Sequence, residues 1–205
     1  MPGITLGGRR RRARHRRQPG LLRLLRAAQG ATVHTFEPEA ENLKLLRANV
    51  ERNGLAGRVV VVPKAVKATS GTTQFFSTPM MGGGMQTTME TFANSFQHER
   101  VADVPCVSLT DHFAEHGIKR VRLCKIDCEG AELEIVRSLT AENAARIDAF
   151  VLEFHPQAYA LKDLVAALET FDRYQLMFAP PKYCERQILW AISRETFREI
   201  AAGIV

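Results

Sequence analysis

The 205-residue sequence predicts an α/β protein with a doubly wound, mainly parallel sheet around one hydrophobic core. From residue 31 onward, strand-like and helix-like segments alternate, which is the order of strand–helix–strand units. The segment Arg58–Val62 adds a continuous run of valines, as expected for a strand that helices cover on both faces. Three predicted strands also end on acidic residues, at the edge where such sheets bind ligands.

The first predicted elements form one strand–helix–strand unit, preceded by a short helix. A short apolar stripe over residues 21–28 fits a helix, and residues 31–36 alternate as a strand. Pro38 suits the start of the next helix, which apolar residues at helical spacing extend to the Asn53-Gly54 stop. The valine strand at 58–62 then completes the unit.

The rest of the chain continues the alternation with one interruption. Residues 71–76 and the glycines at 82–84 predict an irregular or hairpin insertion, and the methionines around those glycines suggest an apolar lid over a substrate. The last strands, 174–178 and 187–192, are predicted to close the sheet as an antiparallel hairpin. Between the insertion and this hairpin we expect a helix at 111–117, a strand at 121–126, a helix from Gly130 to about Leu139, a strand at 147–154 and a helix at 161–171.

The formal net charge of +6 is concentrated at the start of the chain. Nine arginines and no acidic residue precede position 37, which leaves 19 basic against 22 acidic residues beyond it. We therefore predict a basic, disordered tail over residues 1–19 and a folded domain over residues 20–205. Nucleic acid is a disfavoured partner, because only the tail is basic.

Cysteine usage and hydropathy predict a cytoplasmic protein. The four cysteines make neither a disulfide framework nor the paired spacing of a zinc ribbon. No apolar run approaches the roughly 18 to 20 residues that span a bilayer, so we expect no membrane span. An arginine-rich transit peptide over residues 1–26 is the alternative reading of the start.

Glu37 is the first acid at a predicted strand end. A carboxylate in this place commonly accepts hydrogen bonds from both hydroxyls of a nucleoside ribose. The alternative is that Glu37 caps the helix after Pro38, where a negative charge is favourable. The sequence favours neither interpretation.

Asp127 and Glu129 follow the next acidic strand end, immediately before Gly130. They alternate around one residue, so we expect both carboxylates on one side of the cleft, with one holding a cation or substrate and the other acting as a base. The alternative is capping of the next helix by Glu129 and Glu132. His155, which follows Glu153 at a third strand end, is a further candidate base because the ordinary histidine pKa is near neutral.

With these residues placed, the chain resembles the FkbM family of S-adenosylmethionine-dependent methyltransferases. The matching segments are Thr35-Phe-Glu-Pro38 followed by Asn42, Leu46 and Asn49, then Val104-Pro105 through Ser108-Leu109, and above all Lys125-Ile-Asp-Cys-Glu-Gly-Ala-Glu132. The resemblance implies a Rossmann-like class I methyltransferase fold, S-adenosyl-L-methionine as cofactor, and methyl transfer, usually to oxygen, on a small molecule or glycan. No metal is required for such a transfer.

The resemblance also implies roles for individual residues. Glu37, with Pro38 beside it, would bind the ribose, and the segment Lys64-Ala65-Val66 would line the adenine. Asp127 would approach the methionine end of the cofactor or the acceptor. Glu129 and His155 stay candidates for the catalytic step.

The family's glycine-rich turn, Asp-x-Gly-Ala-Asn-x-Gly, is not matched. With Gly20 aligned to its last glycine, a cofactor contact, Arg14, Arg16, Arg17 and Gln18 stand where the acid, the first glycine, the alanine and the asparagine belong. No apolar run before residue 14 supplies the first, central strand, so we expect weakened cofactor binding. Either residues 1–19 are not the ancestral reading frame, or the basic tail is a genuine replacement that serves an acidic partner. The second alternative allows a non-catalytic module with a basic nucleic-acid-binding tail.

Overall fold

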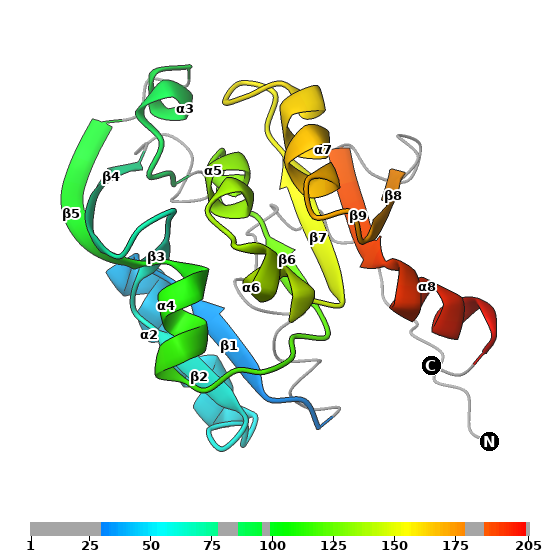
Figure 1. Ribbon diagram of the computed structural model, residues 1–205. Helices are drawn as coiled ribbons and strands as arrows, with labels where there is room; N and C mark the ends of the chain where they lie inside the picture. The colour runs from blue at the N-terminus through cyan, green and yellow to red at the C-terminus, as the bar shows by residue number, and fades with distance from the viewer. Residues whose placement is uncertain (1–29, 78–85, 96–98, 179–186, 204–205) are drawn as a thin grey trace, which may run out of the picture.

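The computed structural model describes residues 30–77, 86–95, 99–178 and 187–203 as an α/β protein with mixed sheets, which confirms the predicted fold class (Figure 1). The basic tail predicted over residues 1–19, Gly20, the helix predicted over 21–28 and the glycines at 82–84 lie outside the described residues.

The first strand–helix–strand unit is present as predicted. Strand β1 (Val33–Phe36) pairs in parallel with β2 (Val59–Val62), and helix α2 (Ala40–Arg52) connects them. Leu46 and Val50 of α2 form an apolar cluster with residues of both strands. The helix therefore covers one face of the pair, which is what the valine run and the helical spacing indicated.

The predicted insertion is a hairpin attached to a short parallel strand. Strand β4 (Gly71–Ser77) pairs antiparallel with β5 (Glu99–Val107), and β5 also pairs in parallel with β3 (Ala65–Val66). Helix α3 (Glu90–Ser95) lies between the two long strands in sequence. Strand β5 was not among the predicted elements, because its first five residues are exposed and carry no apolar alternation.

The second half of the chain forms a four-stranded sheet in the order β6-β7-β9-β8. Strands β6 (Cys124–Ile126) and β7 (Ala149–Phe154) are parallel, whereas β8 (Tyr174–Phe178) and β9 (Gln187–Ser193) close the sheet as an antiparallel hairpin. The predicted C-terminal hairpin is confirmed. All six residues of β7 are buried, as expected for the central strand of this sheet.

Helices cover this sheet and the first strand pair. Helices α5 (Glu132–Arg137) and α7 (Leu161–Glu169) pack on one another beside β7, and their apolar residues join the main core cluster. Helix α4 (Leu109–Glu115) lies in front of β1 and β2 in Figure 1, with α2 behind them. The remaining helices are α6 (Ala141–Ala145) and α8 (Arg194–Ala201). None of the described helices is long and apolar enough to cross a membrane.

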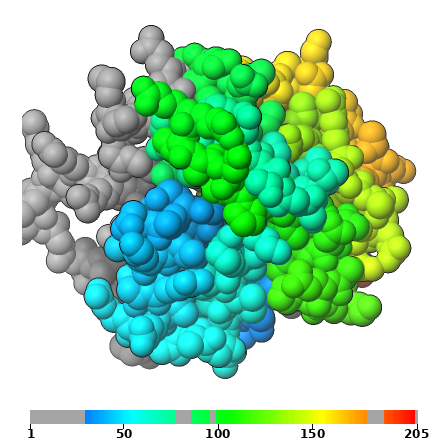
Figure 2. Space-filling view, turned by 90° about the vertical axis from the view of Figure 1, so that its left-hand side faces the viewer, coloured from blue at the N-terminus to red at the C-terminus, as the bar shows by residue number. Residues whose placement is uncertain are grey.

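The described strands form three sheets that share no ladder hydrogen bonds with one another. Two of them carry the parallel strands that precede Glu37 and Asp127: the pair β1-β2 is the first group, and the sheet that begins with β6 is the second. Phe36 of β1 packs against the same core cluster as Ile126 of β6, so side-chain packing joins the groups. Seen from the side of the first group, α2 and β2 (blue to cyan) lie against the green segments that follow them in sequence (Figure 2).

Candidate functional site

The carboxyl ends of β1 and β2 bring two of the predicted cofactor residues together. The backbone N–H groups of Glu37 and Lys64 both donate to the carbonyl oxygen of Val62, at 3.1 and 2.9 Å. Both side chains are partly exposed. The backbones of Glu37 and Lys64 therefore meet at the carboxyl end of the strand pair, where sheets of this kind bind ligands.

Glu39, rather than Glu37, is the N-cap of helix α2. Its carboxylate accepts the N–H of Asn42 at 2.6 Å, whereas Glu37 Oε1 accepts the N–H of Glu39 at 3.2 Å. The alternative that Glu37 is the helix cap is wrong, because another acid fills that position. Pro38 lies between the two acids, one residue before the cap, so it holds Glu37 outside the helix.

The segment Lys64-Ala65-Val66 is divided between two surroundings. Ala65 is buried in a small cluster with Phe75, Val104 and Cys106, below the β4–β5 hairpin. Val66 packs instead against the main core cluster, together with Phe36. Because alternate residues of a strand face opposite sides, the side chain of Ala65 is turned away from the side that Val66 faces.

Asp127 follows β6 and is the more accessible of the two predicted acids. Its carboxylate forms an ion pair with Lys125 at 2.7 Å, and 20% of its side chain is exposed. Carboxylate or imidazole atoms of Asp127, Glu153 and His155 lie within 4.8 Å of one another. The ends of β6 and β7 thus place these side chains together.

A tight turn after Asp127 buries the second acid. Glu129 has φ 49°, in the left-handed region, and Gly130 has φ 106°. A Cβ atom on Gly130 would lie 2.8 Å from Cβ of Ala158, so only glycine fits this close approach. The carbonyl oxygen of Glu129 accepts a hydrogen bond from Oγ1 of Thr87 at 2.8 Å.

Glu132 holds the turn in place from the first residue of α5. Its side chain is fully buried, and its carboxylate accepts the N–H groups of Cys128 at 2.8 Å and Gly130 at 3.1 Å. The hydroxyl of Tyr159 donates to Oε2 of the same carboxylate at 3.0 Å. The predicted capping of this helix by Glu129 and Glu132 is wrong, because Ala131 is the N-cap of α5 and no side chain caps it. The carboxylate of Glu132 binds the turn before the helix instead.

His155 lies between two of these buried carboxylates. Its Nε2 is 3.1 Å from Glu129 Oε2, and its Nδ1 is 3.1 Å from Glu132 Oε1. A third carboxylate, that of Glu153, is 3.9 Å from Nε2. Burial lowers the pKa of His155, but the hydrogen bonds and charges of Glu129 and Glu132 outweigh it and raise the pKa to about 10.

The predicted role of His155 as a base with a near-neutral pKa is corrected by its surroundings. We expected a base with a pKa near neutral, whereas the carboxylates around it keep the imidazole protonated at neutral pH. A protonated imidazole has no proton acceptor to offer. His155 therefore holds Glu129 and Glu132 in place as an ion-pair partner.

Asp127 and Glu129 do not form the simple side-by-side pair that strand alternation suggested. The strand ends at Ile126, so Asp127 stays partly exposed while Glu129 is turned into the interior. Sequence reasoning missed the roles of Glu153 and Tyr159. The acidic end of β7 pointed to Glu153, but nothing in the local pattern pointed to Tyr159.

An open cleft of about 440 Å³ lies next to this network. Its lining is mainly apolar and includes Met89, Gly130, Leu133 and Tyr159. Gly130 and Tyr159 also belong to the turn that Glu132 organises. The volume of the cleft is in the range of small-molecule sites, and Glu134, Arg137 and Ser138 add polar groups to its lining.

The cysteines of β6 and of the turn after it have a structural role. Cys124 and Cys128 pack against the main core cluster, and burial raises the pKa of Cys124 to about 12. A thiol with such a pKa carries almost no thiolate at neutral pH, so Cys124 is no nucleophile.

Comparison with known proteins places the chain in a protein family. The family model described as "Methyltransferase FkbM domain" matches residues 19–176. A similar curated protein is 31-O-demethyl-FK506 methyltransferase FkbM of Streptomyces tacrolimicus, which is 29% identical over 189 residues, or 82% of this chain and 73% of that protein. The crystal structure of methyltransferase FkbM from Methylobacillus flagellatus KT has the same fold, with a TM-score of 0.55 and 17% identity over 83% of this chain. The chain spans about two fifths (40%) of that solved chain.

The close contact at Gly130 gives a first prediction. We expect Gly130→Ala to lower the free energy of unfolding by about 3 kcal/mol, since it adds overpacking to backbone strain. Gly54→Ala is the matched control, because Gly54 also has positive φ (66°) but has nothing within 4 Å of the added Cβ. Its expected cost is about 1 kcal/mol of strain alone. Urea unfolding of the two variants measures the difference, and equal costs would disprove the contact.

The ion pairs of His155 give a second prediction, on pH. A raised pKa in the folded state adds stability that is complete below about pH 6.5 and is lost as the pH rises toward about 10. We expect His155→Gln to cost about 3 kcal/mol at pH 6, because it leaves buried carboxylates unpaired, and to cost less at each higher pH. Urea unfolding of both proteins from pH 6 to 10 measures this convergence. A difference that is constant over the range would contradict the assigned protonation.

Proposed function

Since the chain belongs to the FkbM methyltransferase family, we propose that it transfers a methyl group from S-adenosyl-L-methionine to a hydroxyl oxygen of a small molecule or glycan. The observation that carries this proposal is that Glu37, Lys64 and Asp127 each follow the carboxyl end of a parallel strand. Ligands of doubly wound sheets bind at this edge.

The charges at this edge favour such a cofactor. S-adenosylmethionine carries a cationic ammonium group and a cationic sulfonium centre. Within the described part of the chain, carboxylates predominate at the ends of β6 and β7, where Asp127, Glu129 and Glu153 lie near His155 and Lys125. This excess of carboxylates attracts a cationic donor and repels an anionic one.

Each part of the cofactor has a proposed contact in this chain: the ribose, the adenine and the methionine part. Glu37, positioned by Pro38, accepts hydrogen bonds from the ribose hydroxyls, and Lys64 and Val66 border the adenine. Ala65 contributes to this contact through its backbone, because its side chain is buried beneath the hairpin. Gly20 keeps its assignment to the methionine side as a proposal, although it lies outside the described residues.

The transfer itself is an in-line displacement. The acceptor oxygen forms a bond to the methyl carbon, the carbon–sulfur bond breaks, and S-adenosylhomocysteine leaves with the bonding electron pair. The hydroxyl proton passes to the carboxylate of Asp127, the more accessible acid of the motif. Glu129 and His155 act indirectly, because their buried ion pair fixes the turn that follows Asp127.

The cleft beside the turn is the proposed acceptor site. Its apolar lining by Met89, Leu133 and Tyr159 suits a substrate with a large hydrocarbon surface, and its size suits a small molecule or a sugar unit. The name of the Streptomyces relative specifies 31-O-demethyl-FK506 as that protein's acceptor. This compound is therefore a reasonable first probe, beside hydroxylated sugars.

The alternative, a non-catalytic module with a nucleic-acid-binding tail, rests only on residues 1–19. None of these residues lies in the described part of the chain, and no observation on the fold favours this alternative over methyl transfer.

A third prediction concerns cofactor binding. We expect calorimetry to detect weak or no binding of S-adenosylmethionine and S-adenosylhomocysteine to this chain, and clear binding once the glycine turn is restored by Arg14→Asp, Arg16→Gly, Arg17→Ala and Gln18→Asn. In the restored protein, Glu37→Gln should weaken binding about 10- to 100-fold, the value of a charged hydrogen bond. Glu41→Gln, at an exposed acid on α2, is the matched control and should change nothing. Failure of the restored protein to bind either ligand would reject the assigned cofactor.

A fourth prediction concerns the proton acceptor. In the protein with the restored glycine turn, at saturating S-adenosylmethionine and with 31-O-demethyl-FK506 and hydroxylated sugars as probe acceptors, Asp127→Asn should lower the rate of S-adenosylhomocysteine formation at least about 100-fold. Asp103→Asn, at an exposed acid on β5, is the control and should leave the rate unchanged. An undiminished rate in Asp127→Asn would exclude this carboxylate as the acceptor of the proton.

A further inference from the structure

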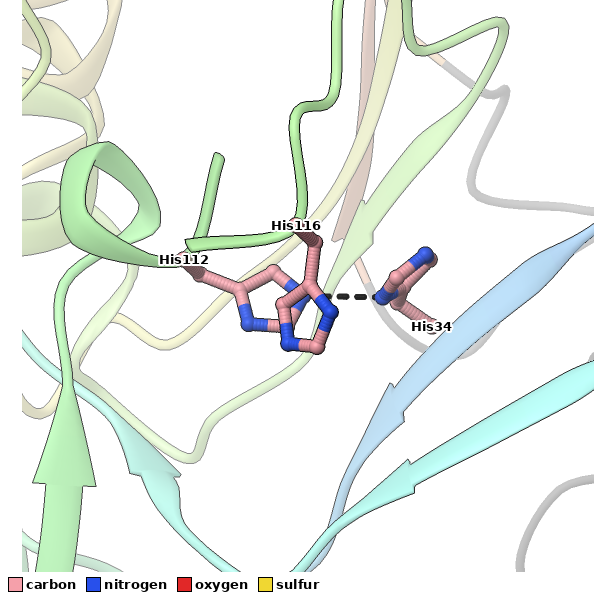
Figure 3. A group of neighbouring side chains, drawn as sticks. All are labelled: His34, His112 and His116. Carbon is pink, nitrogen blue, oxygen red and sulfur yellow. Dashed lines mark hydrogen bonds between the residues drawn. The ribbon is translucent and has the colours of Figure 1, made fainter. Parts of the chain in front are cut away.

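We propose that His34, His112 and His116 form a binding site for one divalent transition metal ion, with zinc as the expected ion. His34 lies on β1, His112 lies in α4, and His116 is the C-cap residue of α4. Figure 3 shows the three imidazole rings gathered between the helix and the strand. This proposal does not depend on the proposed methyl transfer, because none of the three residues belongs to the candidate site.

The fold places the histidines on one side of α4. Residues four apart lie on the same side of a helix, so His112 and His116 can both reach one ion, as paired histidines at this spacing do in zinc enzymes. The helix begins at the Ser108 cap, whose hydroxyl oxygen accepts the N–H of Asp111 at 3.0 Å. His34 completes the set from β1, and its side chain faces away from α2 because the neighbouring Val33 packs against that helix.

The distances suit a shared ion. One ligand nitrogen of each histidine lies within 4.8 Å of the other two, and His112 Nε2 is 2.9 Å from His34 Nδ1. A tetrahedral zinc ion with bonds of about 2.0–2.1 Å separates its ligand nitrogens by about 3.3 Å. Small rotations of the side chains therefore bring all three nitrogens to an ion at the centre.

The protonation states also suit a metal. Burial is the largest of the causes that lower the pKa of His112 to about 4, and the charges of His116 and His34 act in the same direction. Burial and His116 likewise lower the pKa of His34. Neutral imidazole is the form that binds metals, so lowered pKa values favour metal binding by these two side chains. Glu115 favours and Lys64 opposes protonation of His112, and the lowered pKa already includes both charges.

The simpler explanation is that the three rings only pack on one another. Their centroids are 4.3 to 5.1 Å apart, and a neutral histidine pair can share one hydrogen bond. Packing explains the contact between His34 and His112, but it does not require His116, which is exposed. A metal ion gives the exposed imidazole a role, and its open fourth position would be taken by water.

The ion would join β1 to α4. The ring of His112 also packs on Phe36 at 4.7 Å between centroids, and Phe36 is the last residue of β1. The metal would therefore fix the end of this strand through side chains rather than through ladder hydrogen bonds. Three imidazoles favour zinc, nickel, copper or cobalt over magnesium or calcium, which prefer oxygen ligands.

The test is metal binding by the full chain after treatment with a chelator. Calorimetric titration with Zn²⁺ should give one ion per chain, and Co²⁺ should give the visible absorption of a tetrahedral site. His116→Asn and His34→Asn should each weaken Zn²⁺ binding at least about 100-fold, since even loss of a residue that only supports a ligand costs 10- to 100-fold. Lys119→Gln, at an exposed residue near the end of α4, is the matched control and should keep the wild-type affinity.

Circular dichroism checks that each variant folds. His116→Asn is the safer of the two variants, because His116 is exposed and its replacement should not disturb the fold. Zn²⁺ should raise the melting temperature of the wild type and of Lys119→Gln but not that of His116→Asn. Equal zinc affinity in His116→Asn and the wild type would overturn the proposal. So would a cobalt spectrum dominated by thiolate bands, or the absence of binding by the wild type.

Discussion

The buried carboxylate of Glu132 is the interaction on which the candidate site depends. It has no exposed surface, and it is bound by the N–H groups of Cys128 and Gly130, by the Tyr159 hydroxyl and by His155. A buried carboxylate without such partners costs several kcal/mol, so the turn after β6 and the residues after β7 must be in place together. One side chain thereby fixes the relative position of two strand ends. Asp127 directly precedes the turn that Glu132 binds, and it is partly exposed.

The physical requirements of the segment Asp127 to Glu132 explain its sequence residue by residue. The acid at its start stays partly exposed, Cys128 packs in the core, Glu129 forms a buried ion pair, and Gly130 has no room for a side chain. Ala131 is fully buried, which excludes a larger residue before Glu132. Because each position of this segment is constrained in a different way, the segment is a specific motif. It is therefore the strongest part of the resemblance of this chain to the FkbM family.

Local patterns predicted the parts of the fold whose causes are local. The helix between β1 and β2 and the hairpin of β8 and β9 followed from apolar periodicity, whereas α6, with only five residues, was too short to give a period. The protonation of His155 could not be predicted, because Glu129 and Glu132 lie more than twenty residues before it and come from another strand end. His34 and His112 are 78 residues apart, so no sequence spacing revealed their contact. Sequence reasoning thus found the acids at strand ends but not which side chains surround them.

The two groups of parallel strands place different constraints on the two ends of the proposed cofactor. Glu37 belongs to the β1-β2 pair and Asp127 to the sheet of β6, and among the described residues these groups are joined by packing, as at Phe36, rather than by ladder hydrogen bonds. The spacing between Glu37 and Asp127 therefore depends on side-chain packing between the groups, as at Phe36. A ligand that contacts both carboxylates stabilises the arrangement of the two groups that it binds most tightly. The size of this effect equals the difference between its binding free energies for that arrangement and for the others. Binding of the proposed cofactor would then favour one alignment of the two groups, and the proposed metal ion at α4 would act on the same alignment from the β1 side.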